Sequence, residues 1–420
     1  MGIRKMPEGR CSAMDFSLSY SHKASEEEVL RMTTMAALEK KREVGGGGEN
    51  MLVHGDNLPI LRSFCEDAAI KGKVHLVYID PPYSTRRVFT GKSVWYQDDV
   101  EIDHNTHAYE DRLVGAEYLE FLRLRLVLLR ELLSSDGTVY VHLDDKMAFP
   151  AKVLMDEIYG AGNFRNWITR RKCSSKNYTR KRFGNISDYI LCYSKSDRPT
   201  WNQPRQEWEE EHADVEYPRV EEGTGRRFKP VPIYAQETRY GDTGKAWRGM
   251  MPPKGKHWFT SPENLEKLDQ EGRIYWSPTG NPRKKVYLDE SSGIAYPDIW
   301  MDFRDPHNQN VSVTGYPTEK NLDMLKMIVG ASSNEGDLVL DCFCGSGTTL
   351  EAAFSLGRRW IGVDSSQVAI DITTRRMQKA LERDTTPLFG QEKPGFSVFV
   401  SRVSRVDGEK ATSGRRAKRG

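Results

Sequence analysis

The chain has 420 residues, with 62 lysines and arginines against 60 aspartates and glutamates, so its formal net charge is +2. This length predicts one large domain or two fused domains. The sequence contains no run of about 18 apolar residues, so no membrane span is expected. The N-terminus lacks the apolar core of a secretory leader. The six cysteines include no CxxC pair, which disfavours a disulfide framework or a zinc site and favours a reducing, cytoplasmic location.

The first 50 residues are predicted to form an N-terminal extension. Residues 25–44 have the pattern of one capped helix, because Ser25 precedes three glutamates and lysines lie near the end. The four glycines at 45–48 are typical of a linker or a turn.

Residues 51–198 alternate between strand and helix patterns. Strands are predicted at 51–56, 74–80, 137–145 and 188–196, and helices at 58–64, 116–133 and 146–159. Alternation of this kind predicts an α/β fold with a doubly wound, mostly parallel sheet.

The alternation stops in residues 199–314, which are rich in proline, glycine, tryptophan and charge, so an inserted module is predicted there. It then resumes, with helices predicted at 318–333, 345–357 and 365–383 and strands at 337–343 and 358–364. Residues 386–420 are predicted to hold a C-terminal strand and then a basic tail, whose polar composition is typical of disorder.

Positive charge is concentrated just before the inserted module. Residues 165–185 contain eight basic residues and no acidic one, interleaved with Trp167, Tyr178 and Phe183. Basic and aromatic residues mixed in this way are typical of surfaces that contact nucleic-acid phosphates. A solvated protein surface can have the same composition, so the block alone leaves the partner open.

The strand predicted at 74–80 ends in Asp80, Pro81, Pro82 and Tyr83. Prolines cannot continue a sheet ladder, so the strand stops and presents a carboxylate and an aromatic ring on stiff backbone. An ordinary turn at a strand end would also fit, and this tetrapeptide alone does not decide between the two interpretations.

A second strand end carries a glycine-rich turn. Gly345 and Gly347 let the backbone pass close to a ligand, and Asp364 ends the next strand, where it could accept hydrogen bonds from ribose hydroxyls. The dinucleotide fingerprint is incomplete, because its third glycine is missing. Asp341, at the tip of the preceding strand, suits a cationic ligand better than a pyrophosphate.

Together these motifs resemble those of the amino-methylating DNA methyltransferases. "DPPY" at 80–83 resembles their catalytic motif, and "DCFCGSGTT" at 341–349 with Asp364 resembles their S-adenosylmethionine pocket. "GYPTEKNLDML" at 315–325 is similar to their PTEK helix. The order of the motifs is that of the β class, which includes type III modification subunits, and the resemblance covers about residues 50–385.

The resemblance implies a Rossmann-like domain that binds S-adenosylmethionine, releases S-adenosylhomocysteine and needs no metal. Asp341 would bind the ammonium group and Asp364 the ribose, with Phe343 against the adenosyl portion. Asp56 could accept a hydrogen bond from the adenine amine, and Lys320 with the backbone around Thr318 could hold the carboxylate. Acids at strand ends are about as often turn or helix-capping residues. The full expected set is Asp56, Asn57, Thr318, Lys320, Asp341, Phe343, Gly345, Gly347, Thr348 and Asp364.

The resemblance also implies methylation of the N6 amine of adenine in duplex DNA. Asp80 and the carbonyl of Pro81 could accept the hydrogens of this weakly nucleophilic amine, and both prolines would hold these acceptors in place. Tyr83 could stack on the base after its extrusion from the helix, which pairing of the amine makes necessary. Aspartate in the first motif position favours adenine N6, whereas serine is commoner in relatives that act on cytosine N4.

The domain organisation follows from the same resemblance. Residues 51–198 are expected to form the catalytic half of the methyltransferase domain, 199–314 a target-recognition domain and 315–385 the cofactor-binding half, with 1–50 and 386–420 flanking them. The expected DNA contacts are Arg170, Arg171, Lys172, Lys176, Arg180, Lys181 and Arg182 before the insert, and Arg226, Arg227, Arg248, Lys254, Lys256, Arg283 and Lys284 within it.

Several alternatives stay open. A dinucleotide oxidoreductase would use the glycine turn and Asp364 but would leave residues 80–83 and the basic insert without roles. A cytosine-N4 methyltransferase or a non-catalytic DNA-binding specificity protein would share the fold, and RNA or a protein amide could be the acceptor. The expected partner is double-stranded DNA in the nucleoid, in a restriction-modification or defence context, without a membrane; a homodimer and a restriction or defence partner subunit remain open.

Overall fold

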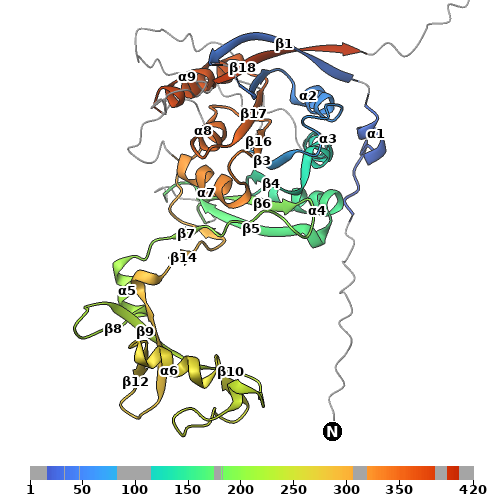
Figure 1. The fold of residues 1–420 in the computed structure, drawn as a ribbon. Coiled ribbons are helices and arrows are strands. Elements are labelled where there is room, and N and C mark those ends of the chain that lie inside the picture. The colour runs from blue at the N-terminus through green and yellow to red at the C-terminus, as the bar shows by residue number, and fades with distance from the viewer. Residues whose placement is uncertain are drawn as a thin grey trace, which may run out of the picture. The chain divides into compact units, whose positions relative to one another are not determined.

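The computed structural model describes residues 17–32, 34–46, 48–82, 115–174, 181, 183–305, 319–383 and 395–405. These residues form two compact units (Figure 1). The first contains the described residues up to Gln203 and from Pro297 onward, and the second is Pro204–Tyr296.

The first unit is built on one sheet. Its strands are β1 (Thr34–Gly45), β2 (Asn50–His54), β3 (Val74–Ile79), β4 (Leu133–Leu143), β5 (Phe164–Arg171), β6 (Ser187–Ser194), β15 (Ile299–Trp300), β16 (Leu338–Asp341), β17 (Arg359–Asp364) and β18 (Gly395–Arg405). Their order is β1-β18-β2-β17-β16-β3-β4-β6-β5-β15. The central run from β18 to β4 is parallel, whereas β1 and β6 pair antiparallel with their neighbours.

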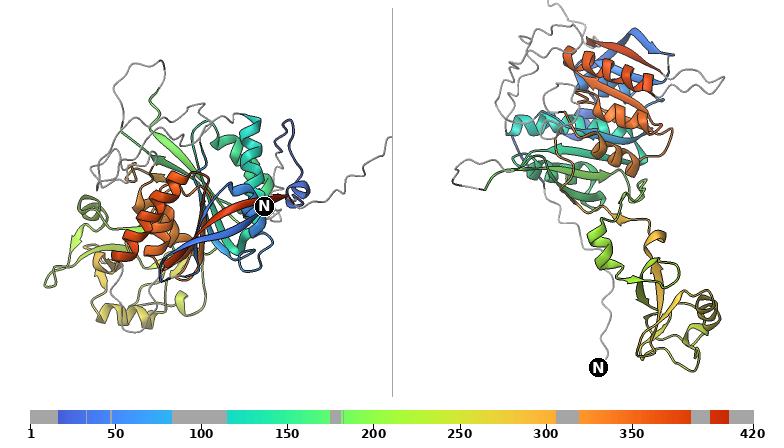
Figure 2. Two further views of the ribbon diagram at one scale, coloured as in Figure 1. Left: turned by 90° about the horizontal axis from the view of Figure 1, so that it is seen from above. Right: turned by 90° about the vertical axis from the view of Figure 1, so that its left-hand side faces the viewer.

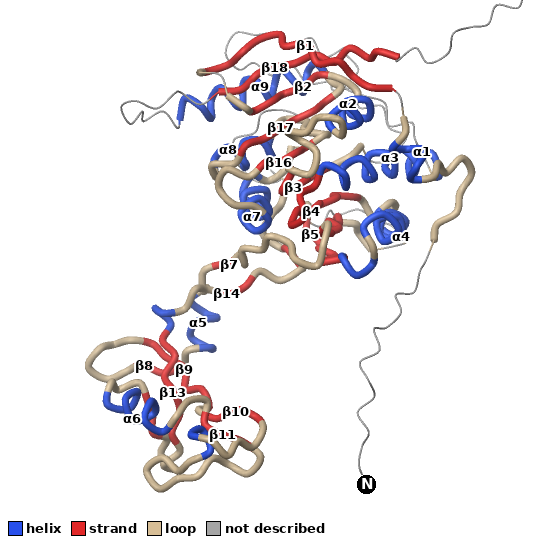
Figure 3. The backbone as a smooth tube through the Cα atoms, turned by 45° about the vertical axis from the view of Figure 1, so that its right-hand side comes forward, coloured by secondary structure: helices blue, strands red, loops and turns tan. Residues whose placement is uncertain are grey.

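Helices cover both faces of this sheet, as Figures 1 and 3 show. They are α1 (Glu26–Leu30), α2 (Asn57–Phe64), α3 (Ala116–Leu132), α4 (Ala148–Tyr159), α7 (Leu322–Ser332), α8 (Thr348–Ser355) and α9 (Gln367–Arg383), with a 3-10 turn η1 (Ala161–Asn163). One face carries α2, α3 and α4, and the other carries α7, α8 and α9 (Figure 2). The predicted doubly wound, mostly parallel α/β fold is therefore confirmed.

The core explains why the central strands are apolar along their whole length. Leu76 and Ile79 of β3 and Leu122 and Leu126 of α3 are fully buried. A parallel strand covered by helices on both faces has no solvent-facing side, so its sequence is a continuous apolar run. Asp80 directly follows such a run and is half-buried, and the next residue, Pro81, is buried.

The predicted single helix at 25–44 is wrong. The capping box of Ser25 and Glu28 starts a helix as expected, but α1 ends at Leu30 and the chain continues as β1. β1 pairs antiparallel with β18 from the far end of the chain. This long-range pairing satisfies the backbone of an alanine- and lysine-rich segment whose local propensity is helical, and tertiary pairing outweighs weak propensity.

The second unit is a smaller mixed structure (Figure 3). Its elements are β7 (Arg205–Gln206), α5 (Glu210–Glu216), β8 (Arg219–Val220), β9 (Arg227–Pro232), β10 (Tyr234–Gln236), η2 (Asp242–Gly244), β11 (Lys256–Trp258), α6 (Pro262–Gln270), β12 (Ile274–Trp276), β13 (Pro282–Tyr287), η3 (Leu288–Glu290) and β14 (Ile294–Ala295). A four-stranded sheet has the order β12-β13-β9-β8. Ile233, Trp247, Trp258, Leu265 and Ile274 form its core.

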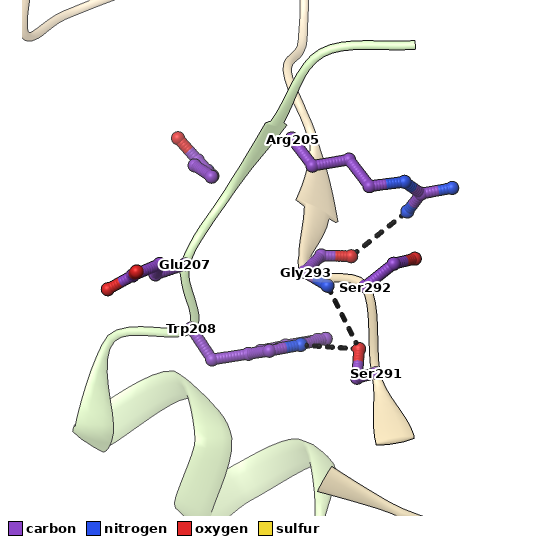
Figure 4. Close-up of a pocket in the computed structure, with 7 residues that line it drawn as sticks. Arg205, Glu207, Trp208, Ser291, Ser292 and Gly293 are labelled. Atoms are coloured by element: carbon purple, nitrogen blue, oxygen red, sulfur yellow. Dashed lines mark hydrogen bonds between the residues drawn. The ribbon is translucent and has the colours of Figure 1, made fainter. Parts of the chain in front are cut away.

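The second unit lies within the segment 199–314 but does not fill it. Residues 297–305 belong to the first unit, where β15 pairs in parallel with β5. Where the chain enters and leaves the second unit, β7 and β14 pair antiparallel. Arg205 donates to the carbonyl of Gly293 over 3.0 Å, and the indole of Trp208 donates to Ser291 Oγ over 2.9 Å beside a small open pocket (Figure 4).

No helix in the described part of the chain is long and apolar enough to cross a membrane.

Candidate active site

Three neighbouring parallel strands end in carboxylates at the same edge of the sheet. β17 ends with Asp364, β16 ends with Asp341, and Asp80 directly follows β3. Because the three strands are adjacent in the order β17-β16-β3, the sheet brings together the two predicted motifs although about 260 residues separate them in sequence. The carboxyl edge of a parallel sheet is where α/β proteins bind ligands.

Burial dominates the electrostatics of this edge. Asp341 is only 2% exposed, and burial raises its pKa to about 7, although a hydrogen bond from Thr349 and the Phe343 amide, which donates to Asp341 Oδ1 over 3.0 Å, oppose the shift. Burial also raises the pKa of Asp364, against hydrogen bonds from the amides of Ser366 and Gly345, each 2.9 Å long. Carboxylates that resist ionisation because they are buried favour a cationic ligand beside them.

The glycine-rich turn between β16 and α8 adopts left-handed backbone, with φ of 51° at Gly345 and 78° at Gly347. A side chain at Gly347 would begin 2.7 Å from the methyl group of Thr373 on α9, whose hydroxyl donates to the Gly345 carbonyl over 2.8 Å. The sequence interpretation attributed this glycine to close approach of a ligand. The structure gives a different reason, which is that α9 packs against the turn.

Lys320 is placed beside the predicted catalytic carboxylate. Its ammonium group lies 2.8 Å from Asp80 Oδ2, and the residue is 9% exposed. The preceding residue, Glu319, forms an ion pair with Arg376 of α9. A residue expected to hold the carboxylate of a cofactor therefore contacts the predicted catalytic motif directly.

Asp56 and Asn57 lie at the start of α2, where both accept hydrogen bonds from Arg125. Asp56 caps α2 by accepting from the Leu58 amide, and it also accepts from Arg125 over 3.1 Å. Asn57 donates to the carbonyl of Cys342 over 2.6 Å and accepts from Arg125 over 2.5 Å. Asn57 thus holds the chain just after β16, and Asp56, with 60% of its side chain exposed, can accept further hydrogen bonds.

The sequence interpretation missed Arg125 and Phe121, two residues of α3 that lie close to the predicted site residue Phe343. The guanidinium of Arg125 lies 3.6 Å from the ring centroid of Phe121, and that ring lies 5.9 Å from the ring of Phe343. Both come from α3, which the sequence suggested only as an apolar core helix. An arginine inside so apolar a helix was the available signal, since a buried cation requires a partner.

The remaining predicted site residues divide into two groups. Pro81 and Pro82 follow Asp80, and Thr348, the first residue of α8, is buried and accepts a 3.0 Å hydrogen bond from Arg376. The other predictions, Tyr83, Thr318, Lys176, Arg180 and Arg182, lie outside the described residues.

Arg170 is a correction to the predicted DNA-contacting cluster. It is 0% exposed and donates to both carboxylate oxygens of Asp188 over 2.9 and 2.6 Å, and to Asp305 over 2.9 Å. Asp188 belongs to the neighbouring strand β6, so a count of charges along 165–185 could not reveal the pair. Arg171 and Lys172 are half-buried and Lys181 is exposed, which leaves them accessible.

The predicted cations of the second unit differ in their acidic neighbours. Arg226 pairs with Asp289 and Glu290, Arg227 with Asp214, and Arg248 with Glu266 and Asp269. Within the described ranges, no ion pair is found for Lys254, Lys256, Arg283 or Lys284. Two of these lysines lie over aromatic rings instead, Lys256 over Tyr234 at 4.5 Å and Lys284 over Phe259 at 5.4 Å.

Replacing Arg170 should destabilise the first unit. We expect Arg170→Ala to lower the free energy of unfolding by about 3–5 kcal/mol, because Asp188 would remain buried without this cation. Urea denaturation measures the change, and Arg171→Ala, one residue further along β5, is the control with an expected change within about 0.5 kcal/mol. Equal losses in the two variants would contradict the assigned role of Arg170.

Comparison with known proteins places the chain among DNA-modifying proteins. A family model described as DNA methylase matches residues 74–375. The type II methyltransferase M.EcaI of Enterobacter cloacae is 52% identical over 304 residues, which cover 72% of this chain and 64% of that protein.

Two further relatives extend the comparison. The EcoPI Mod subunit, a type III restriction-modification protein of Escherichia phage P1, is 25% identical over 435 residues, covering 86% of this chain and 66% of that protein. The DNA adenine methyltransferase YhdJ of Escherichia coli K12 is 39% identical over 94 residues, covering 22% of this chain and 32% of that protein. The chain spans between 52% and 66% of the length of four of the curated relatives it matches. Because the family model covers well over half of the sequence and contains both motifs that meet at the sheet edge, the chain belongs to the DNA methylase family of N6 and N4 amino-methyltransferases.

Proposed function

We propose that the chain transfers a methyl group from S-adenosylmethionine to the N6 amine of adenine in duplex DNA, in a restriction-modification or defence context. The observation that carries the proposal is the carboxylate of Asp80, presented at the end of β3 beside the buried acid Asp341 and the half-buried acid Asp364. Aspartate at the start of the catalytic motif and the adenine-specific relative favour adenine over cytosine N4.

The residues at the sheet edge fit a cationic cofactor. Asp341 would accept from the ammonium group of the methionine portion, whose charge compensates for the burial that now raises the pKa of this carboxyl. Asp364 would accept from the ribose hydroxyls, and Phe343 would lie against the adenosyl portion. When bound, the cofactor supplies an electrophilic methyl group on a sulfonium. Asp56 would accept from the adenine amine.

The residues around Asp80 would prepare the acceptor amine. Asp80 and the Pro81 carbonyl are hydrogen-bond acceptors fixed at the end of a buried strand, so they can bind the two amine hydrogens with little reorganisation. Lys320, whose ammonium group lies 2.8 Å from Asp80, would also bind the cofactor carboxylate. The positive charge of this lysine would then lie close to both carboxylates. The target base must leave the duplex before its amine can reach these groups.

The second unit would recognise the DNA sequence. Lys254, Lys256, Arg283 and Lys284 support this role best, because Arg226, Arg227 and Arg248 would bring the negative charge of their paired acids towards the phosphates. Arg171, Lys172 and Lys181 of the first unit would contact phosphates and position the duplex. The type III relative suggests a restriction subunit as a further partner.

The methylated base that is found in the DNA after the reaction shows which base accepts the methyl group. DNA incubated with the full chain and S-adenosylmethionine, digested to nucleosides and analysed by mass spectrometry, should contain N6-methyladenine. Finding N4-methylcytosine would contradict the assignment to adenine, and finding neither methylated base would contradict the proposed function.

Asp80→Ala should separate chemistry from cofactor binding. We expect a loss of about 100- to 1,000-fold or more in the single-turnover rate, with cofactor affinity close to that of the wild type, because the carboxylate acts on the amine. Rapid-quench assays and calorimetry give the two quantities. A variant that methylates DNA at the wild-type rate would show that Asp80 has another role.

Cofactor affinity should rise with pH up to about 7. Asp341 binds a cation only as the carboxylate, so below its pKa of about 7 each pH unit should weaken the affinity by about tenfold. The raised pKa of Asp364 adds a dependence of the same sign. Calorimetry between pH 5.5 and 7 should find this rise and a shallower one in Asp341→Asn; a flat or falling profile in the wild type would contradict the role of Asp341.

Two triple variants of the second unit test which cations meet DNA. Lys254, Lys256 and Lys284 changed to glutamine should weaken binding and flatten its dependence on salt by about 0.9 per lost contact. Arg226, Arg227 and Arg248 changed to glutamine remove the same charge from acid-paired positions and should leave the slope unchanged. The reverse order of effects, measured by fluorescence anisotropy at several salt concentrations, would refute the assignment.

A further inference from the structure

A buried arginine links the glycine-rich turn to the segment that carries Lys320. Arg376 projects from α9, and its side chain is 9% exposed. It donates to Thr348 Oγ1 over 3.0 Å and to the carbonyl and hydroxyl oxygens of Ser346, each over 3.3 Å. The same guanidinium therefore contacts the end of the turn and the first residue of α8.

The other contacts of Arg376 are acidic. Its Nη1 lies 2.8 Å from Glu319 Oε1, and its Nε donates to Glu351 Oε2 over 2.5 Å. Glu319 is only 4% exposed, so this pair is shielded from solvent and interacts more strongly than a surface pair would. A planar guanidinium with several fixed donors suits such a multiple contact better than a lysine would.

The next residue after Glu319 is Lys320, which pairs with Asp80. A series of contacts therefore connects the glycine turn to Asp80. Arg376 contacts the turn and Glu319, and Lys320, the residue after Glu319, contacts Asp80. Lys320 has a long, flexible side chain, whose ordering costs conformational entropy. The buried ion pair between Glu319 and Arg376 fixes the backbone from which the Lys320 side chain extends. The conformational entropy that is lost when Lys320 becomes ordered is therefore smaller.

We propose that Arg376 is a positioning residue for methyl transfer, which acts through Glu319 to hold Lys320 between the cofactor and Asp80. This inference rests on the proposed function and adds to it a residue outside every motif described above. Because Arg376 contacts the glycine turn and Glu319 together, it fixes the distance between the cofactor-binding half of the site and the lysine that serves the catalytic half.

The chain offers a matched control on the same helix. Arg383 also pairs with Glu351, but 70% of its side chain is exposed, and no contact with Glu319 is found for it in the described structure. We expect Arg376→Gln to lower the single-turnover rate at saturating S-adenosylmethionine by about 10- to 100-fold, and Arg383→Gln to lower it by less than about twofold. Thermal unfolding of each variant identifies any loss of folded protein.

A double-mutant cycle separates positioning from a general structural role. If Arg376 acts through Lys320, then Arg376→Gln should have little further effect on the rate in a Lys320→Ala background. A folded Arg376→Gln protein as fast as Arg383→Gln would overturn the proposal, and so would multiplicative losses in the double variant. If Arg376→Gln does not fold, Glu319→Gln, which keeps the size of the side chain, takes its place in the cycle with the same expected results.

Binding of S-adenosylhomocysteine keeps this test distinct from that of the proposed function. Calorimetry should find weaker binding to Arg376→Gln than to Arg383→Gln, because Lys320 and the turn both lose a fixed neighbour. If the wild type binds this ligand but methylates no adenine, the proposed acceptor is wrong, whereas the comparison of affinities still decides the role of Arg376. Equal affinities in the two variants would count against it.

Discussion

The burial of negative charge at the ends of β17, β16 and β3 is the constraint on which the rest of the site depends. Parallel pairing places Asp364, Asp341 and Asp80 at the ends of adjacent strands, where Asp341 is buried and Asp80 and Asp364 are half-buried. Like charges in a desolvated site raise each other's free energy unless cations are close. Lys320 supplies one such cation, and a cationic cofactor would supply another. The carboxylates that the fold brings together would therefore favour binding of the proposed cationic ligand.

Three buried arginines of the first unit have structural roles. Arg125 joins α3 to Asp56 and Asn57 at the start of α2, Arg170 joins β5 and β6 to Asp305, and Arg376 joins the glycine turn to Glu319. Each is buried with acidic or amide partners, so removal of one partner leaves an unfavourable buried group. Of the cations predicted to contact DNA, Arg170 is excluded by this burial, and in the second unit Arg226, Arg227 and Arg248 differ from the others in having acidic partners.

Local patterns allowed much of the fold and the motifs to be predicted. Apolar runs bounded by glycine, proline and aspartate identified β3, β16 and β17, and the adjacent acids followed from the rule that parallel strands share a carboxyl edge. The errors concern interactions distant in sequence: β1 pairs with β18, and Arg170 pairs with Asp188 of another strand. The packing of Gly347 against Thr373 of α9 is likewise distant in sequence and was not predicted. Arg376 had no local signal, because it lies in an ordinary amphipathic helix.

Proton release on cofactor binding tests the central claim most directly. At pH 6 most Asp341 carboxyls, with a pKa of about 7, carry a proton that a bound ammonium group must displace. Calorimetric titration with S-adenosylmethionine in two buffers of different ionisation enthalpy should therefore report the release of about one proton per bound cofactor, and Asp341→Asn should release less. Binding without proton release in the wild type would contradict the account of a buried acidic site neutralised by a cationic ligand.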